Sequence, residues 1–503
     1  MAVFCRSCAP FLLLAQPFSA GDGSFSFPWR RCFVKMGFFL MFVYFLYEFM
    51  AFPTYGECSH QWVVDHGVYH AKKNGGIVIA QQKYFDALRN RTEEPFESEW
   101  HFETAKPSDL SLVRHYEIPK QIEQALIDDS NGSWTEAWVK TFTVPHEPMA
   151  SWLEDVIEEI GKTEAIDAFI VFQLCKSLEI VAGLRGIPVI YWDGASFRQP
   201  VYKPSLGYLD FKGVQSAANE ASERYSLFKK EKELTRYILS PKEILALFLA
   251  DDYLHKIKEF DQAPAYDWGI ALSGDAAYIQ AFNNSYTINE FMFDTLNNID
   301  PSKSLIRSHP VELLGVARWQ GAVDASPDTE SFILQCKRIA VTWSKTAFLS
   351  MLWGKPTHII KTPNSAFSEG AAHSFDTDSK CAEDDFVSFI TFGYFVPLEF
   401  LNDPSYLRWR ISKPAEKEIY MKNLAFLFSQ KGIDLDAFSE ISGTEARVAY
   451  LLNNRHDYLM TKALESTAKY EARQVELDYM LASVSWKITK PLRWLRERMK
   501  SWR

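Results

Sequence analysis

Residues 338–360 read RIAVTWSKTAFLSMLWGKPTHII. The apolar runs 338–343 and 357–360 have the length of short buried strands. Between them, residues 346–353 have the apolar spacing of a helix, which Gly354 ends. A strand, a helix and a second strand in so short a stretch predict a parallel α/β sheet.

The same alternation continues upstream of this stretch. We expect strands at 166–172, 187–192, 268–273 and 304–308, and helices at 149–160, 174–185, 217–257 and 288–299. The polar, aperiodic segment 258–267 divides these elements into two sets. Two successive Rossmann-like units joined by a linker predict the GT-B architecture, an α/β fold that binds its ligands in the cleft between the units.

The composition excludes several classes of protein. With 47% hydrophobic and 23% charged residues, the chain of 503 residues can bury large cores and is not a disordered protein. Its net charge of −10 argues against nucleic acid as a partner, because that partner requires a basic surface. The seven cysteines are dispersed, which indicates a reducing compartment rather than a disulfide framework.

Two N-terminal segments look like targeting signals. Residues 1–20 have only a short apolar run next to Pro10, so a first strand over 10–16 is favoured over a signal peptide. The apolar run within 37–52 ends at Glu48, well short of the ~20 residues that a membrane-spanning helix needs. We therefore expect a buried helix, or a helix on the membrane surface, over 37–52.

The segment SLIRSHP, residues 304–310, carries the first candidate site. A strand that ends at His309 and Pro310 places an imidazole at the carboxyl edge of the sheet, where open α/β folds bind ligands. Arg307 and His309 both supply donors for a phosphate group. A single histidine in such a turn is structural as often as it is functional. This turn alone therefore leaves both a structural and a phosphate-binding role open.

The second candidate site is the helix start at Ser344, Lys345 and Thr346. Ser344 is a natural N-cap, and free backbone N–H groups at a helix start attract phosphate. The two hydroxyls and the lysine add further donors. An ordinary capped helix can have the same residues, but the histidine turn in the same unit favours a phosphate site.

Acidic residues follow two other expected strands. Asp193 stands in YWDGASFRQP, residues 191–200, and Asp275 ends the segment ALSGD. Each aspartate alone is typical of a cap or turn. Glycosyl transfer, however, needs a carboxylate near the anomeric carbon, and two of them at one cleft indicate catalysis.

Together these four elements resemble the bacterial β-Kdo transferases of capsule and O-antigen assembly. The resemblance covers about residues 160–430 and implies a retaining GT-B enzyme that uses CMP-Kdo as its substrate, with no metal or other cofactor. Bacterial GT-B sialyltransferases share the histidine turn and the Ser/Thr helix start, so these two elements indicate a CMP-sugar site more than a particular sugar.

The resemblance also implies roles for single residues. His309 would bind the donor phosphate with Ser344 and Thr346 beside it, and the same donor site would include Lys345, Arg307 and Pro310. Asp193 matches the acidic residue at the reacting carbon, and Asp275 matches the one implicated in a covalent sugar–enzyme adduct. The family has Glu at the position of Asp193, which leaves the division of roles open. Arg198 is a possible contact for an acceptor or sugar carboxylate.

A metal site is a weaker hypothesis. Cys58, His60, Asp65, His66 and His70 have the residue types of metal ligands, but their spacing fits no known template. We therefore predict no metal.

The C-terminal tail has its own signature. Residues 483–493, SVSWKITKPLR, resemble the ending of many bacterial polysaccharide glycosyltransferases. From 487 onward there are seven Lys or Arg and one Glu, with apolar residues at helical spacing. A basic amphipathic helix over 486–503 is expected to lie on an anionic membrane surface, and the alternative is a basic terminus docked on the acidic body.

We therefore expect five parts and one function. The parts are an acceptor-side Rossmann-like domain (1–257), a linker (258–267), a CMP-sugar-binding Rossmann-like domain (268–412), crossover helices (413–456), and a long helix with the membrane-associating tail (457–503). The expected function is retaining transfer of an acidic sugar, which the resemblance implies to be Kdo, from a CMP donor to a glycan or lipid-linked acceptor. The expected location is the cytoplasmic face of a bacterial membrane. A different nucleotide sugar, or a non-catalytic role in a glycan assembly complex, is the alternative.

Overall fold

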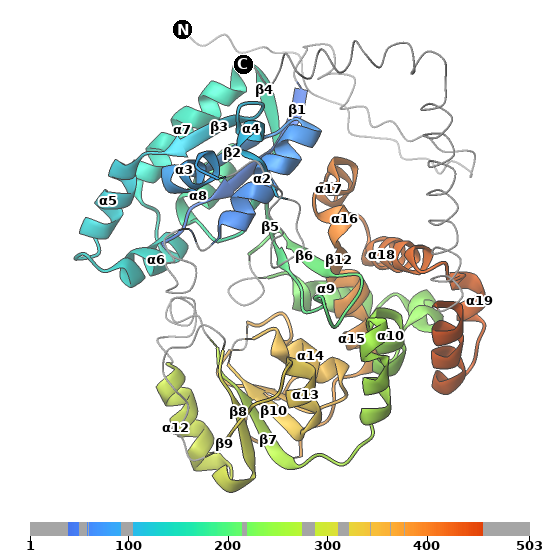
Figure 1. The fold of residues 1–503 in the computed structure, drawn as a ribbon. Helices are drawn as coiled ribbons and strands as arrows, with labels where there is room; N and C mark the ends of the chain where they lie inside the picture. Colours follow the sequence, from blue (N-terminus) through green and yellow to red (C-terminus); the bar gives the residue numbers. More distant parts are fainter. Residues whose placement is uncertain are drawn as a thin grey trace, which may run out of the picture.

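The computed structural model describes residues 39–49, 58, 60–91, 104–213, 219–273, 287–309, 321–342, 344–362, 364–376 and 378–455. These residues form two α/β units, each built on its own sheet (Figure 1). The predicted fold class, two Rossmann-like units in the GT-B arrangement, is confirmed.

The first sheet has seven strands in the order β12-β6-β5-β4-β1-β2-β3. Their bounds are β1 Phe39–Leu46, β2 Ile77–Gln81, β3 Arg114–Ile118, β4 Glu164–Val171, β5 Val189–Gly194, β6 Leu206–Asp210 and β12 Phe395–Pro397. The strands from β5 to β3 are parallel, whereas β6 pairs antiparallel with both β5 and β12. The chain therefore returns from the second unit to supply the last strand of the first.

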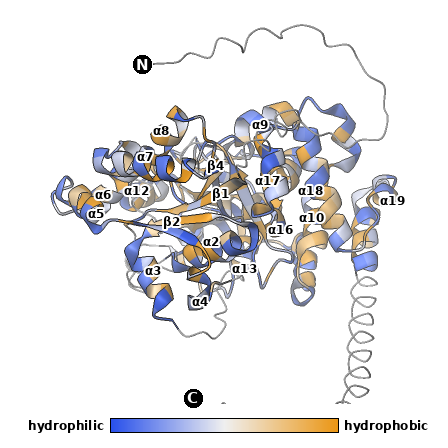
Figure 2. Ribbon diagram, turned by 90° about the horizontal axis from the view of Figure 1, so that it is seen from above, coloured by the Kyte–Doolittle hydropathy of each residue, from blue (hydrophilic) through white to orange (hydrophobic). Residues whose placement is uncertain are grey.

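Helices cover both faces of the first sheet. One face packs against α5 Lys120–Asp128, α6 Trp134–Thr143, α7 Glu147–Gly161 and α8 Lys176–Leu184. The other packs against α2 Gln61–Asn74, α3 Gln82–Arg89, α4 Pro107–Leu110, α16 Leu398–Leu401 and α17 Pro404–Ile411. Figure 2 shows hydrophobic strands β1 and β2 between helices whose residues are partly hydrophilic.

The strand β1 shows that the prediction for residues 37–52 was wrong. We expected a helix there, but the run forms a central strand between β2 and β4. Val43 contributes to the core on one face of the sheet and Tyr44 to the core on the other, and both are buried. A strand covered on both faces needs apolar residues throughout, so its sequence lacks the alternation that distinguishes a strand from a buried helix.

The second sheet has five parallel strands in the order β11-β10-β7-β8-β9. Their bounds are β7 Tyr266–Ala271, β8 Ser304–Arg307, β9 Ala322–Val323, β10 Cys336–Val341 and β11 Thr357–Ile359. Helix α12, Ile288–Asn298, packs on one face, and α13, Thr329–Leu334, with α14, Thr346–Leu352, packs on the other. The predicted strands and helices of this unit are confirmed to within a few residues, as are β4, β5, α7 and α8 in the first.

The stretch 217–257 is not one helix. It contains α9, Ala221–Phe228, a 3₁₀ turn, α10, Pro241–Phe248, and a 3₁₀ segment over Asp251–Glu259. Pro241 occupies the first position of α10, directly after Ser240. Proline is favoured at that position because it has no N–H to leave unpaired, and so it starts a new helix rather than continuing an old one.

The C-terminal part of the chain packs back onto the first sheet. A helix over 384–394, which ends in a π-helical turn, leads into β12, and α18, Glu416–Gln430, and α19, Leu435–Ser439, follow. Residues 444–455 are helical, as predicted. The predicted strand at 10–16 and the predicted long helix with the membrane-associating tail at 457–503 lie outside the described residues.

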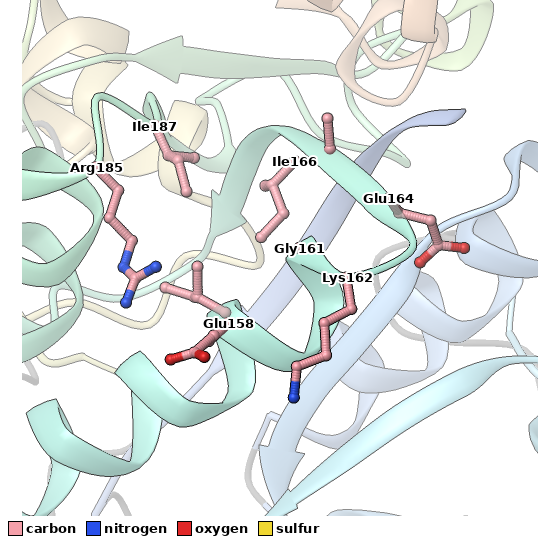
Figure 3. A pocket seen from close by; sticks show the side chains of 9 residues that line it. Glu158, Gly161, Lys162, Glu164, Ile166, Arg185 and Ile187 are labelled. Atoms are coloured by element: carbon pink, nitrogen blue, oxygen red, sulfur yellow. The ribbon is translucent and has the colours of Figure 1, made fainter. Parts of the chain in front are cut away.

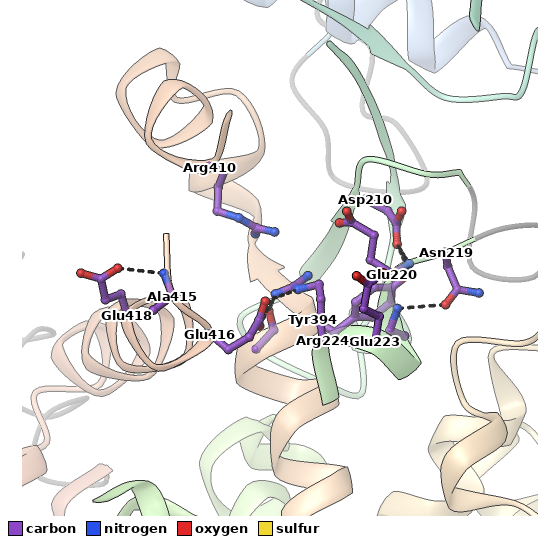
Figure 4. Close-up of polar contacts among 12 residues, drawn as sticks. Asp210, Asn219, Glu220, Glu223, Arg224, Tyr394, Arg410, Ala415, Glu416 and Glu418 are labelled. Carbon is purple, nitrogen blue, oxygen red and sulfur yellow. Dashed lines mark hydrogen bonds and ion pairs between the residues drawn. The ribbon is translucent and has the colours of Figure 1, made fainter. Parts of the chain in front are cut away.

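A buried polar cluster fixes this return of the chain (Figure 4). Arg224 of α9 forms an ion pair with Glu416 of α18, with N–O distances of 2.8 and 3.0 Å, and donates to the Gly393 carbonyl oxygen at 2.7 Å. Asp210, at the end of β6, accepts a hydrogen bond from the Tyr394 hydroxyl at 2.9 Å. The cluster therefore joins α9 and β6 of the first unit to segments that follow the second.

In the part of the chain that the structure describes, no helix combines the length and the apolar character needed to cross a membrane.

Candidate functional site

The two units contact each other where β5 ends and α14 begins. Lys345, directly before α14, forms an ion pair with the Asp193 carboxylate at the end of β5. Its ammonium also donates to the Gly194 carbonyl oxygen at 2.5 Å. The Ser196 hydroxyl donates to the Lys345 carbonyl oxygen at 3.2 Å. Two residues predicted separately, one in each unit, are thus brought into direct contact.

The Asp193 carboxylate is held on both oxygens. Its Oδ2 contacts Lys345, and its Oδ1 accepts the backbone N–H of Gly194 at 2.6 Å. The side chain keeps 23% of its surface exposed, so a ligand can reach it. A carboxylate with a fixed orientation and an open face suits a nucleophile or a base.

Two half-buried cations lie beside this carboxylate. Arg198 donates to the carbonyl oxygens of Ala195 and Gly194 at 3.0 and 3.5 Å. Burial lowers the pKa of Arg198 to about 10, and the nearby Asp193 carboxylate opposes that shift. The guanidinium points to the backbone that carries Asp193, so its predicted contact with an acceptor or sugar carboxylate stays a prediction.

Of the two cations, Lys345 is the one whose pKa falls close to physiological pH. Burial lowers the pKa of its ammonium from 10.5 to about 8, and Arg198 acts in the same direction, while Asp193 favours the charged form. A lysine with this pKa changes its charge close to physiological pH. The charge that orients Asp193 is therefore sensitive to pH.

Three adjacent strands of the second sheet bring the predicted donor residues to one edge. The order β10-β7-β8 places Ser344 after one outer strand and His309 after the other. Since neighbouring strands are about 4.8 Å apart, the two residues stand on strands about 10 Å apart, with β7 between them. His309 is exposed at this edge. Asp275, which follows β7, and Pro310 lie outside the described residues.

The helix start differs slightly from the prediction. The helix α14 begins at Thr346, with Lys345 rather than Ser344 at the N-cap position. The Ser344 hydroxyl still accepts the backbone N–H of Thr346 at 3.1 Å and donates to the Thr346 hydroxyl at 2.9 Å. The two hydroxyls are therefore adjacent, as the phosphate hypothesis requires.

Arg307 is engaged elsewhere. Its guanidinium pairs with the buried Asp324 carboxylate and donates to the Ser326 carbonyl oxygen at 3.3 Å. These contacts tie β8 to the segment after β9. The predicted role of Arg307 in donor binding therefore rests on the sequence alone.

The cluster of potential metal ligands does not form a metal site within the described residues, where no group of three such side chains is arranged to hold an ion. Asp65 pairs with Arg91 at 2.6 Å. The rings of His66 and His70 lie 4.3 Å apart in the core, and burial lowers the pKa of both. These two histidines are core residues in the structure.

Sequence reasoning missed a set of polar residues at the end of β1. Glu48 is fully buried and contacts His60, Tyr84 and Gln173. The signal was present, since Glu48 is the charged residue that ends the apolar run of β1. In the sequence this residue marks only the end of the run, whereas in the structure β1 places it at a ligand-binding edge.

A surface hollow lies at the opposite edge of the first sheet (Figure 3). It is lined by residues at the end of α7, the start of β4 and the loop before β5, among them Glu158, Lys162 and Arg185. Because open α/β folds bind ligands at the carboxyl ends of their strands, this hollow at the amino ends is not the candidate site.

Comparisons with known proteins agree with a sugar-transferring enzyme. Residues 65–219 match the sequence model of the glycosyltransferase 99 family N-terminal domain. No curated protein sequence matches the chain. Among solved structures, Thermosulfurimonas dismutans KpsC, a β-Kdo 2,7 transferase, is 11% identical over 55% of this chain and 89% of its own, with a TM-score of 0.32. Os79 from O. sativa, in complex with UDP, is 10% identical over 83% of this chain and 100% of its own, with a TM-score of 0.28.

The match to the glycosyltransferase 99 family model agrees with the predicted resemblance, and residues 65–219 include one of the four elements that carry it, the segment around Asp193. It identifies the activity class as glycosyl transfer.

Proposed function

We propose that the chain transfers an acidic sugar, Kdo in the first instance, from a CMP donor to a surface-polysaccharide or lipid-linked acceptor, with retention of anomeric configuration. The observation that carries this proposal is the contact between Asp193 and Lys345. It sets a partly exposed carboxylate of the first unit beside Lys345, one of the expected donor residues of the second. Nucleophile and leaving group of a sugar transfer need this proximity.

In the proposed first step, an Asp193 oxygen forms a bond to the anomeric carbon. The bond from that carbon to the CMP phosphate breaks, and its electron pair leaves with the phosphate. His309, Ser344 and Thr346 donate to the departing phosphate and stabilise its charge. Lys345 keeps the attacking carboxylate in place.

In the second step, the acceptor oxygen displaces the enzyme carboxylate from the anomeric carbon. Two inversions give net retention. Asp275 would hold the sugar or carry the single adduct in place of Asp193, so the division of roles with Asp193 belongs to the proposal. The cations and hydroxyls of the chain supply the charge stabilisation, and the proposed reaction uses no metal or cofactor.

We further propose that the basic segment 486–503 holds the enzyme on the inner face of the bacterial membrane. Its support is the sequence: seven Lys or Arg with an apolar stripe. Each basic residue near an anionic surface contributes about 1 kcal/mol.

Nucleotide binding gives a direct test of donor class. CMP is expected to raise the melting temperature of the purified protein, while UDP and GDP do not. At 100 times its dissociation constant a ligand adds about 2.7 kcal/mol to the free energy of unfolding. His309→Ala should lose the CMP effect, and His255→Ala, an exposed histidine on the 3₁₀ segment 251–259, should keep it.

The other outcomes of this assay are equally informative. A shift with UDP or GDP instead of CMP would refute the Kdo assignment and favour another nucleotide sugar. The absence of any shift would favour the non-catalytic role in a glycan assembly complex.

The pKa of Lys345 predicts opposite pH effects on activity and stability. Transfer should fall as pH rises through about 8, because neutral Lys345 no longer holds the Asp193 carboxylate. Between about 8 and 10.5 the unfolded chain keeps the lysine proton that the folded chain has lost, so this group makes unfolding less favourable as pH rises. pH profiles of transfer rate and of urea midpoint measure the two effects.

Lys345→Arg is the control for this titration, because arginine stays charged over the whole range. The variant should transfer at a reduced rate that no longer declines near pH 8. A decline that persists in the variant would assign the titration to a different group.

A further inference from the structure

A buried carboxylate–histidine pair lies at the carboxyl end of β1, the same edge of the sheet that carries Asp193. Glu48 has no exposed surface, and its Oε2 contacts the His60 Nδ1 and accepts from Gln173 Nε2 at 3.0 Å. Its Oε1 accepts from the Tyr84 hydroxyl. Both carboxylate oxygens are therefore committed to fixed partners.

The partners of Glu48 are themselves fixed. The Gln81 side chain exchanges two hydrogen bonds with the Glu48 backbone, both 2.9 Å long. The Trp138 indole donates to Gln173 Oε1 at 3.2 Å. A buried carboxylate in such a network is costly compared with apolar packing, and its position at the ligand-binding edge indicates a functional reason for it.

The pair defines the chemistry of the imidazole. With Nδ1–H donating to the Glu48 carboxylate, Nε2 is the basic nitrogen, and the carboxylate stabilises the ring when it gains a proton. His60 keeps 14% of its surface exposed. The Glu48 carboxylate thus fixes the orientation of the imidazole, and part of the side chain remains exposed.

Aromatic rings connect this pair to the proposed reaction centre. Phe172, after β4, lies 4.9 Å from the His60 ring, and Trp62 lies 5.1 Å from Phe172; both are half-buried. Trp192, 5.8 Å from Trp62, directly precedes Asp193 on β5. Half-buried aromatic faces with a polar anchor beside them suit the C–H faces and hydroxyls of a sugar ring.

The spacing of the strands fits this ligand. In the order β5-β4-β1, the ends of β5 and β1 stand two strand spacings apart, about 10 Å. A sugar ring lying over Phe172 and Trp62 would bridge the gap between His60 and Asp193.

We infer that this edge binds the acceptor sugar and that His60, positioned by Glu48, is the base that deprotonates the attacking hydroxyl. This inference rests on the proposed function and supplies its missing base. The hydroxyl proton passes to His60 Nε2 as the oxygen forms its bond to the anomeric carbon. The bond from that carbon to the enzyme carboxylate breaks, its electron pair returns to the carboxylate, and His60 later releases the proton to water.

The test uses the sugar–enzyme adduct itself. The full-length protein is mixed with CMP-Kdo, excess donor is removed, and intact-protein mass spectrometry follows the decay of the adduct with water as acceptor. His60→Gln should form the adduct normally but lose it about 10²-fold or more slowly, because only the second step needs the base. His115→Gln, a half-buried histidine on β3, should decay like the wild type.

Further variants separate catalysis from folding. Glu48→Gln removes the charge that positions His60 and keeps the size of the side chain, so it should also slow adduct decay while CMP still stabilises the protein. Trp62→Ala should raise the KM for aryl glycoside acceptors more than it lowers kcat.

The outcomes distinguish the inference from the proposed function. If the adduct of His60→Gln decayed at the wild-type rate, the inference would be overturned and the proposed function would stand. A loss of CMP stabilisation in that variant would have the same meaning. The absence of CMP stabilisation and of any adduct in the wild type would instead refute the proposed function.

Discussion

Asp193→Asn is expected to lower the rate of sugar transfer by about 10⁴-fold or more. An amide of the same shape cannot attack the anomeric carbon, and loss of a single catalytic nucleophile or base commonly costs that much. The donor-binding residues stand on the other unit, so CMP should still stabilise the variant. The measurements are initial transfer rates with CMP-Kdo and melting temperatures with CMP.

The variant should be only modestly less stable than the wild type. Loss of the Asp193 charge lowers the pKa of Lys345 below its present value of about 8, because Asp193 is the group that favours its charged form. Lys345 then gives up its proton instead of remaining as a half-buried, unpaired charge. A rate loss without unfolding is therefore the expected signature.

Two further substitutions control this prediction. Asp167→Asn removes a carboxylate of β4 that pairs with Arg408 at 2.7 Å, far from the proposed centre, and should leave transfer unchanged. Asp193→Glu restores the carboxyl group that the β-Kdo transferases are expected to have here, and should regain part of the rate. Full transfer by Asp193→Asn would remove Asp193 from the mechanism.

Arg224→Met is expected to lower the free energy of unfolding by about 3–5 kcal/mol. Arg224 and Glu416 are 7% and 8% exposed, so the substitution leaves the Glu416 carboxylate buried without its partner. The hydrogen bond to the Gly393 carbonyl oxygen is lost as well. Urea unfolding followed by tryptophan fluorescence measures the change.

The adjacent residue provides a matched control. Lys417 pairs with Glu233 on the surface, and Lys417→Ala should leave the unfolding midpoint close to that of the wild type. The double variant Arg224→Met, Glu416→Leu should recover most of the loss, because no unpaired charge remains. If Arg224→Met were as stable as Lys417→Ala, the cluster would not hold the two segments together.

The second unit could be predicted well because its signals are local. Its strands and helices alternate within short stretches such as 338–360, and each boundary has a cap, a glycine or a proline close by. The strand β1 could not be predicted in the same way, since a fully buried strand and a buried helix are equally apolar. Strand β12 has three residues and pairs with a segment far back in the chain.

The candidate site was predicted as separate residues, not as an arrangement. Asp193 and Lys345 were each identified from a strand end or a helix start, but no local signal joins them across the two units. Glu48 and His60 come together only because β1 ends beside α2. Contacts of this kind are set by the topology of the sheets, which a single sequence without repeats or paired motifs does not reveal.

The late position of β12 has a consequence for synthesis on the ribosome. The edge of β6 that pairs with β12 is made long before its partner, and at about 5–20 residues per second it waits on the order of ten seconds or more. During that interval an open strand edge can pair with another nascent chain. We therefore expect the nascent first unit to depend on a chaperone, or on early docking of the second unit, until residues 395–397 emerge from the ribosome.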